Sequence, residues 1–301
     1  MANLPSFTKT FHREPYPAIS PTRPELSAAG KTVLVTGAAG RIGQAICVAF
    51  ARAGAKHVAM LDLDGGNLER ARSEIEQNTE CRSTALHLFP VDITDQNAVR
   101  EAFSAIASAA GGRLDVLVNN AGYQSSAALY RDADLDEWWK SFEINVKGSF
   151  IVSQEFVRRA APPPQCSNGN ITPQPVLINL SSVLAHWGIR QGYVNKQSPY
   201  SGSKLAITRA MEVLQEEEPW LRVVNIHPGL VVSPMSAKSG TLEFSLDHVD
   251  LPAHFAVWLA SDEADFTKGR FLWSNWDVEE LQQRKAEILE QDLLRLKVDG
   301  L

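Results

Sequence analysis

The stretch "KTVLVTGAAGRIGQAICVAF", Lys31–Phe50, decides the fold class of the chain. It begins with a run of β-branched and apolar residues that is typical of a buried strand. The glycine-rich turn "TGAAGRIG" follows, and an amphipathic helical segment starts directly after it. Glycines let the backbone turn sharply and approach a ligand, and free amides at a helix start attract a diphosphate. The stretch therefore predicts a dinucleotide site at Gly37, Arg41, Ile42 and Gly43, although a tight turn without a ligand is the alternative for this motif alone.

The same alternation of short apolar runs and helical segments continues along the chain. Seven runs have the composition of buried strands: KTVLVT, HVAMLD, ALHLFPVD, LDVLVNN, PVLINLSS, LRVVNIHPG and GRFLW. Helical segments between successive strands imply right-handed crossovers and a parallel sheet covered on both faces. We therefore predict an α/β fold, a Rossmann doubly wound seven-stranded parallel sheet with helices on both faces.

The predicted domain organisation has three parts. Residues 1–30 hold five of the sixteen prolines and no periodicity, so they form an N-terminal arm that lies over the body or is left loose. Residues 31–277 form one Rossmann-type domain. Residues 278–301 have leucines at helical spacing and are expected to form one C-terminal helix packed on the domain.

Composition excludes several function classes. The chain has 44% apolar residues, 21% charged residues and a net charge of −6, which disfavours nucleic acid and membranes as partners. Its three cysteines are odd in number and widely spaced, so neither a disulfide framework nor a metal site is expected. No signal-peptide core is present, and no run approaches the ~20 apolar residues of a membrane span. We expect a cytoplasmic protein.

An acidic residue indicates which cofactor the turn binds. The second apolar run ends at Asp62, nineteen residues after Gly43. An acid near this spacing accepts hydrogen bonds from an adenosine ribose and repels a 2′-phosphate. NAD is therefore preferred, while NADP stays possible because Arg41 offers a compensating charge.

Taken in order, the motifs resemble those of the short-chain dehydrogenase/reductase family. The resemblance covers about Lys31 to Trp273. The occurrence of all these motifs in the family's order is a far more specific signal than any single motif. It implies that Asp92, followed by Ile93, contacts the adenine. The element "NNAG", with Asn119, Ala121 and Gly122, lines the adenosine pocket by the same resemblance.

The catalytic part of the family pattern is also present. The resemblance implies Asn145 in "FEINVKG" as the tetrad asparagine that holds a water, and Ser182 in "INLSS" as the serine that bonds the substrate oxygen. In "YSGSK" it implies Tyr200 and Lys204, the latter also a ligand of the nicotinamide ribose. Each residue alone has a structural alternative: a strand-end turn, a helix cap or an amphipathic helix edge.

Two further family elements follow, one with a departure. "HPGLVVS" matches the motif that holds the nicotinamide, with Val231 and with Ser233 in place of threonine. The family's ordinary turn is T-G-x-x-x-G-x-G, whereas this chain reads T-G-x-x-G-x-x-G with Arg41 at the second glycine. An arginine there could lie along the diphosphate or reach a 2′-phosphate, which is the reason for keeping NADP open.

Two tyrosines compete for the role of acid/base. Tyr193 lies eleven residues after Ser182, close to the family's usual interval, and Tyr200 lies eighteen after it. Only Tyr200 has a lysine four residues later, on the same helix face, and Pro199 suits the first turn of that helix. Tyrosine titrates near about 10, and a neighbouring ammonium should lower that pKa. We predict that Tyr200 is essential and that Tyr193 only adjusts the pocket.

The predicted function is an NAD(P)-dependent oxidoreductase acting on a small molecule, which interconverts a secondary alcohol and a ketone. The resemblance implies that Ser233–Asp250 is a lid segment that shapes substrate choice. Its Met235, Leu242, Phe244 and Leu246 favour a bulky, apolar substrate, with ordinary packing as the alternative. The chain also resembles fungal family members, many of which act in secondary metabolism. The alternatives are an epimerase or cyclase without net redox and a catalytically inactive cofactor-binding regulator.

The family resemblance also implies self-association. Family members commonly form a homodimer or homotetramer through the long helices that flank the fourth and fifth strands. Residues 136–161 and 201–218 are the expected interface in this chain.

Overall fold

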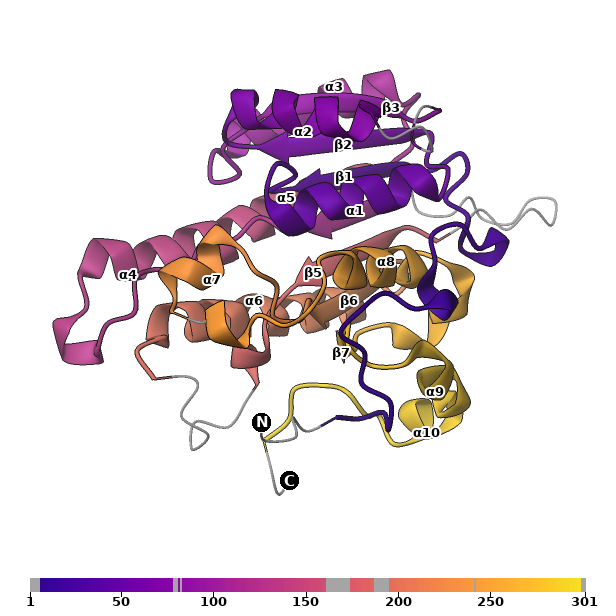
Figure 1. Ribbon diagram of the computed structural model, residues 1–301. Coiled ribbons are helices and arrows are strands. Elements are labelled where there is room, and N and C mark those ends of the chain that lie inside the picture. Colours follow the sequence, from indigo (N-terminus) through magenta and orange to yellow (C-terminus); the bar gives the residue numbers. More distant parts are fainter. Residues whose placement is uncertain are drawn as a thin grey trace.

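The computed structural model describes residues 6–77, 81, 83–160, 174–186, 195–240 and 242–298. Seven parallel strands form one sheet in the order β3-β2-β1-β4-β5-β6-β7 (Figure 1). Their bounds are β1 Thr32–Thr36, β2 His57–Asp62, β3 Ala85–Pro90, β4 Val116–Asn119, β5 Val176–Leu180, β6 Arg222–His227 and β7 Phe271–Trp273. The predicted α/β fold is therefore confirmed, and the sheet reverses its winding direction between β1 and β4, where ligands bind in such folds.

The helices cover both faces of the sheet, as the alternation predicted. Their bounds are α1 Arg41–Arg52, α2 Gly65–Gln77, α3 Gln96–Ala109, α4 Leu135–Phe142, α5 Ser149–Arg159, α6 Ser198–Glu217, α7 Pro234–Lys238 and α8 Asp250–Leu259. Helices α1, α2 and α8 bury side chains in one core, whereas α3, α5 and α6 bury theirs in the other. Val33 and Val35 of β1 face the first core and Leu34 the second, because successive strand side chains point to opposite faces.

The C-terminal segment differs from the prediction of one helix. It forms two short helices, α9 Val278–Gln283 and α10 Lys285–Glu290, separated by Arg284 with φ −94° and ψ 10°. The Arg284 guanidinium lies 3.6 Å from the centre of the Phe7 ring and donates to the Phe7 carbonyl. Contact with the N-terminal arm thus accompanies the break in the helix, a tertiary interaction that helical periodicity does not reveal.

The second helix ends early for a local reason. Asp292 takes a left-handed conformation with φ 47°, and the Leu293 amide donates to the Ile288 carbonyl at 3.0 Å. The Asp292 amide donates to the Leu289 carbonyl at 3.4 Å, which completes a Schellman motif. The leucines after Glu290 therefore continue in an irregular segment and not in a helix.

The N-terminal arm packs against the first core. Two short 3-10 turns, Pro17–Ile19 and Pro24–Leu26, bury Ile19 and Leu26 completely. Figure 1 shows the arm running beside α8, α9 and α10. Among the residues that the structure describes, no helix is both long and apolar enough to span a membrane.

Candidate active site

The glycine-rich turn connects β1 to α1 at the carboxyl edge of the sheet. Gly37 has φ +63°, and a Cβ there would lie 2.9 Å from the Ala121 Cα. A Cβ at Gly43 would lie only 2.1 Å from the Gly37 carbonyl oxygen. Neither site has room for a side chain, so both predicted glycines are required by the turn itself.

The amino end of α1 is open to an anionic ligand. Its N-cap is Gly40, which offers no side-chain cap, and its first turn carries no acidic residue. By contrast, α3 and α9 have Asp95 and Asp277 as N-caps, each accepting from first-turn amides. The uncapped amides of α1 and the partial positive charge of its end therefore fit the diphosphate of a dinucleotide. Arg41 and Ile42 occupy this first turn, and Arg41 is exposed.

Asp62 lies beside the turn, as its spacing predicted. Its carboxylate accepts the Ala39 amide at 3.0 Å through Oδ2 and the Leu63 amide at 2.8 Å through Oδ1. The side chain thus connects β2 to the glycine-rich turn and keeps a negative charge next to α1.

The two residues after β3 have different environments. Asp92 is exposed, and its Oδ1 accepts from the amide and the hydroxyl of Thr94. Ile93 is buried, and a Cβ at Gly148 would lie 2.7 Å from its side chain. Ile93 therefore packs between the end of the sheet and the helix that carries Asn145.

Asn120, the second asparagine of the NNAG element, holds the glycine-rich turn. Asn120 Nδ2 donates to the carbonyls of Thr36 at 2.8 Å and Gly37 at 3.0 Å. Asn119 points to α5, where its Nδ2 donates to Ser153 Oγ at 2.7 Å. Ala121 contributes its amide to Thr36 Oγ1 at 3.0 Å. Adjacent asparagines look alike in sequence, and the alternating direction of side chains on β4 is the signal that could have separated them.

Ser182, Tyr200 and Lys204 meet at the carboxyl end of β5. Ser182 follows β5 and caps a short 3-10 turn, Val183–Ala185, through the Leu184 amide at 3.2 Å. Tyr200 and Lys204 lie one turn apart near the start of α6, which has Pro199 in its first turn. The other serine of the pair, Ser181, bonds Thr208 at 2.5 Å inside the core. Ser182 is thus the member of the pair beside Tyr200.

Burial dominates the acid–base properties of this cluster. It raises the pKa of Tyr200 to about 12, against a lowering effect of its hydrogen bond with Ser182. It lowers the pKa of Lys204 to about 8, because the interior disfavours the charged ammonium. The pKa of Tyr200 is thus raised overall, and not lowered as expected, because burial outweighs the effects that favour the phenolate. Lys204 Nζ donates to the Leu180 carbonyl at 2.6 Å and lies 5.8 Å from the centre of the Tyr200 ring.

Asn145 lies in a π-helical segment, Glu143–Gly148, that joins α4 to α5. Its Oδ1 accepts the Tyr123 amide at 2.7 Å, and its Nδ2 donates to the Tyr123 carbonyl at 2.8 Å and to Ser203 Oγ at 2.9 Å. A Cβ at Gly122 would lie 3.3 Å from Asn145 Oδ1 and 3.4 Å from Lys204 Nζ. Gly122 thus separates the asparagine from the lysine and lets both approach the backbone of the NNAG element.

A polar cluster beside Asn145 was not predicted. Tyr123 OH donates to Glu137 at 2.7 Å, and Lys238 Nζ donates to Tyr123 OH at 2.8 Å. The ammonium also lies 4.3 Å from the centre of the Tyr123 ring. The cluster joins α4, the NNAG loop and α7 of the lid segment, three places that no sequence motif relates.

Val231 and Ser233 lie between β6 and α7. Val231 is buried and forms an isolated parallel bridge with Asp247. Ser233 caps α7: its Oγ accepts the Ser236 amide at 3.1 Å, and Ser236 Oγ accepts the Ser233 amide at 2.9 Å. Ser233 therefore fixes the start of the lid segment. Tyr193, the competing tyrosine, lies outside the described residues.

Comparisons with known proteins identify relatives of the chain and support its fold. The family model "short chain dehydrogenase" matches residues 31–243. The short chain dehydrogenase mpl6 of Monascus purpureus is 33% identical over 294 residues, covering 95% of this chain and 94% of that protein. A short chain dehydrogenase/reductase of Claviceps purpurea (strain 20.1) is 32% identical over 295 residues, covering 95% and 91%. A short-chain type dehydrogenase/reductase from Mycobacterium ulcerans superposes with a TM-score of 0.70 at 23% identity, covering 82% and 89%, which supports the fold.

The burial of Lys204 predicts a pH-dependent effect on stability. Below pH 8 the ammonium is charged in both folded and unfolded chains, so folding carries its full desolvation cost. Between about pH 8 and about 10.5 the folded lysine loses its proton while the unfolded one keeps it, so the cost falls as pH rises. The melting temperature of Lys204→Met should therefore be no lower than that of the wild type at pH 7. Above pH 8 the melting temperature of the wild type should rise relative to that of the variant. Thermal unfolding of both proteins across pH 6.5–10, roughly 3.5 pH units around this pKa, measures the two melting temperatures.

Arg209→Met, at an exposed position of the same helix, is the control that should show no such pH dependence. A melting-temperature difference between wild type and Lys204→Met that stays constant over this range would contradict the burial argument.

Proposed function

The chain belongs to the short-chain dehydrogenase/reductase family of NAD(P)-dependent oxidoreductases, and we propose that it interconverts a secondary alcohol and a ketone. The observation that carries the proposal is the buried Tyr200 phenol, hydrogen-bonded with Ser182 and one helical turn before the buried Lys204. A phenol and an ammonium one turn apart, both withdrawn from water, suit proton transfer at a substrate oxygen.

The chain supplies the proton chemistry and the positioning. When bound, a nicotinamide cofactor supplies or accepts the hydride at the substrate carbon. Tyr200 gives its hydroxyl proton to the ketone oxygen in reduction and takes a proton from the alcohol in oxidation. Ser182 offers a second hydrogen bond to the same oxygen and holds it beside the phenol. Because burial raises the pKa of Tyr200 to about 12, the phenol carries its proton at neutral pH.

Lys204 and Asn145 assist Tyr200 without contacting the substrate: the lysine through its charge, the asparagine by positioning α6. A buried ammonium favours the phenolate that forms when Tyr200 gives up its proton. Asn145 ties the NNAG loop to Ser203 of α6 through its hydrogen bonds to Tyr123 and Ser203. It thereby keeps the lysine-bearing helix in register with the loop that would line the cofactor.

NAD is the cofactor that the site favours. The Asp62 carboxylate lies beside the turn, held by the Ala39 and Leu63 amides, where it would repel a 2′-phosphate. Arg41 is exposed at the start of α1, and its positive charge favours NADP.

The lid segment supports a bulky, apolar substrate. Leu242, Phe244 and Leu246 are 47%, 43% and 41% exposed, an unusual density of apolar surface for one short segment. Similarity to family members from Monascus and Claviceps supports a role like that of the fungal enzymes. We propose a secondary metabolite with extended apolar surface as the substrate class.

Self-association through α4, α5 and α6 is part of the proposal. Trp139, Phe150, Leu205 and Val213 are 58%, 53%, 45% and 48% exposed on these helices. Trp139 and Phe150 also border an apolar groove of about 400 Å³ that reaches Ile207 of α6. An apolar surface of this kind on the helices beside β4 and β5 fits a second copy of the chain, in a homodimer or a homotetramer.

Tyr200→Phe should abolish turnover while the cofactor still binds. Loss of the phenolic proton should lower kcat by at least about 10²-fold. NADH consumption with a panel of apolar ketones measures turnover, and NADH fluorescence titration measures binding. Tyr193→Phe is the matched control and should retain activity. Product formed without net NADH consumption would favour the epimerase or cyclase, and an active Tyr200→Phe would overturn the proposed role.

The cofactor preference should depend on the charge of Asp62. Wild-type protein should bind NADH at least about tenfold more tightly than NADPH, a difference of roughly 1.4 kcal/mol. Asp62→Asn keeps the shape of the side chain but removes the repulsion, so the two affinities should converge. Arg41→Ala should weaken NADPH more than NADH. Equal affinity of the wild type for both cofactors in a calorimetric titration would exclude the preference for NAD.

A charge on the apolar groove should disrupt the oligomer. Trp139→Glu combined with Phe150→Glu places two carboxylates where the second copy would pack, so the mass in solution should fall to that of a monomer. Light scattering after gel filtration measures it. Leu289→Glu, at an exposed position on α10, is the control and should leave the mass unchanged. A wild type that is already monomeric would rule out this interface.

A further inference from the structure

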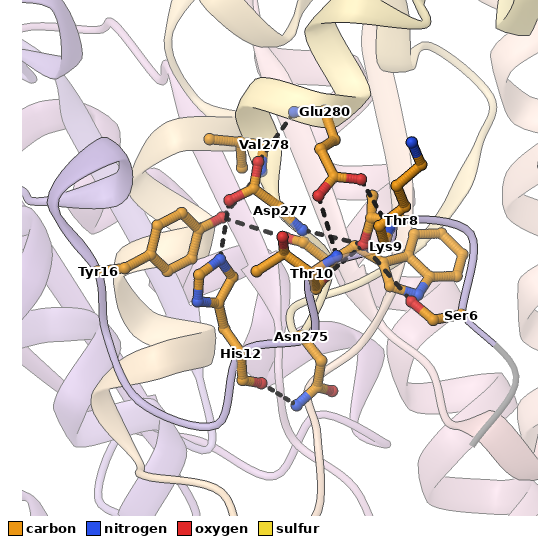
Figure 2. A network of polar contacts seen from close by, with 11 residues as sticks. Ser6, Thr8, Lys9, Thr10, His12, Tyr16, Asn275, Asp277, Val278 and Glu280 are labelled. Atoms are coloured by element: carbon orange, nitrogen blue, oxygen red, sulfur yellow. Dashed lines mark hydrogen bonds and ion pairs between the residues drawn. The ribbon is translucent and has the colours of Figure 1, made fainter. Parts of the chain in front are cut away.

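The N-terminal arm is anchored on the segment that follows β7 (Figure 2). The His12 amide donates to the Asn275 carbonyl at 2.7 Å, and Asn275 Nδ2 donates back to the His12 carbonyl at 2.9 Å. His12 Nε2 lies 2.8 Å from Asp277 Oδ2, and its ring stacks on Tyr16 with centres 3.6 Å apart. The backbone of the arm is therefore held in one register at His12.

More anchors lie on either side of His12. Glu280 accepts the amides of Lys9 at 2.7 Å and Thr10 at 2.9 Å. Tyr16 OH donates to the Trp276 carbonyl at 3.1 Å and accepts the Val278 amide at 2.9 Å. These contacts fix the arm before and after the residue that follows His12, which is Arg13.

Arg13 reaches away from this anchor to the end of the lid segment. Its Nη1 donates to Asp247 Oδ1 at 3.0 Å, and its carbonyl accepts the His248 amide at 2.8 Å. The Asp247 side chain is only 3% exposed. A buried carboxylate is costly unless it is paired, so Arg13 supplies a charge that Asp247 needs.

Asp247 in turn holds the segment that follows β6. Its Oδ2 accepts the Leu230 amide at 2.7 Å, and its own amide donates to the Leu230 carbonyl at 3.1 Å. Gly229 has φ +85°, and a Cβ there would lie 2.7 Å from Asp247 Oδ2. The carboxylate thus packs directly against the backbone of residues 229–231, the start of the predicted nicotinamide motif.

We propose that Arg13 is a positioning residue: the anchored arm holds the Asp247 carboxylate, and Asp247 fixes the Leu230–Val231 wall of the cofactor site. The chain of contacts runs from Asn275 and Asp277 through His12 and Arg13 to Asp247 and Leu230. The assignment of this wall to the nicotinamide rests on the proposed function. The arm precedes the Rossmann-type domain in sequence, yet it supports the Leu230–Val231 wall, which lies between β6 and the lid segment.

The test uses the full chain and compares Arg13→Ala with Arg13→Lys and Arg23→Ala. Arg23 belongs to the same arm and donates to Glu263 at 2.7 Å, away from residues 229–248, so it is the matched control. Amide hydrogen exchange reports the wall directly. In Arg13→Ala the Leu230 and Asp247 amides should exchange at least about tenfold faster, while Arg13→Lys restores protection and Arg23→Ala leaves it unchanged. Amides of β1 and β4 monitor global unfolding.

A second readout connects the wall to the cofactor. Arg13→Ala should weaken NADH binding about three- to tenfold with a smaller change in kcat, since Arg13 touches no reacting atom. Unchanged exchange at Leu230 and Asp247 would overturn the positioning role. Faster exchange with unchanged NADH affinity would overturn its link to the cofactor. Absence of NAD(P)H binding in the wild type would refute the proposed function, and the exchange result would still decide whether Arg13 holds the wall.

Discussion

The carboxyl ends of β1 and β4 are tied together by hydrogen bonds between Thr36 and Asn120, and the site depends on this tie. Thr36 Oγ1 accepts the amides of Asn120 at 3.1 Å and Ala121 at 3.0 Å, while Asn120 Nδ2 donates to the Thr36 and Gly37 carbonyls. These strands lie on the two sides of the point where the winding of the sheet reverses. The tie therefore determines where the glycine-rich turn lies relative to the NNAG element.

The second constraint on the site is that its buried polar side chains need hydrogen-bond partners within the protein. Lys204, Asn145 and Ser203 are all buried, and each has a partner on another element or on the backbone of its own helix. A buried ammonium is unfavourable, as the lowered pKa of Lys204 shows. Its burial is a cost in stability at neutral pH that an apolar side chain would avoid, a feature that is typical of functional sites.

Three segments that are far apart in sequence meet outside the classical sheet-and-helix body: the arm, the lid segment and the residues after β7. The family model ends at residue 243, so much of this assembly lies beyond the shared family core. Its contacts are hydrogen bonds to backbone groups and side-chain contacts to buried carboxylates, such as Arg13 with Asp247 and His12 with Asp277. Such contacts set the register of the arm without contributing a large apolar core.

The sequence by itself determined the α/β fold class, the glycine-rich turn and the pairing of Tyr200 with Lys204. All three follow from local properties, namely apolar runs that alternate with helical segments and the spacing of four residues on one helix. Tertiary structure alone decided which neighbouring asparagine holds the turn, where the Lys204 ammonium points and why the C-terminal helix breaks at Arg284. It also brought Arg13 to Asp247, 234 residues later in the chain. These outcomes depend on side-chain direction, burial and long-range hydrogen bonds, none of which a local pattern encodes.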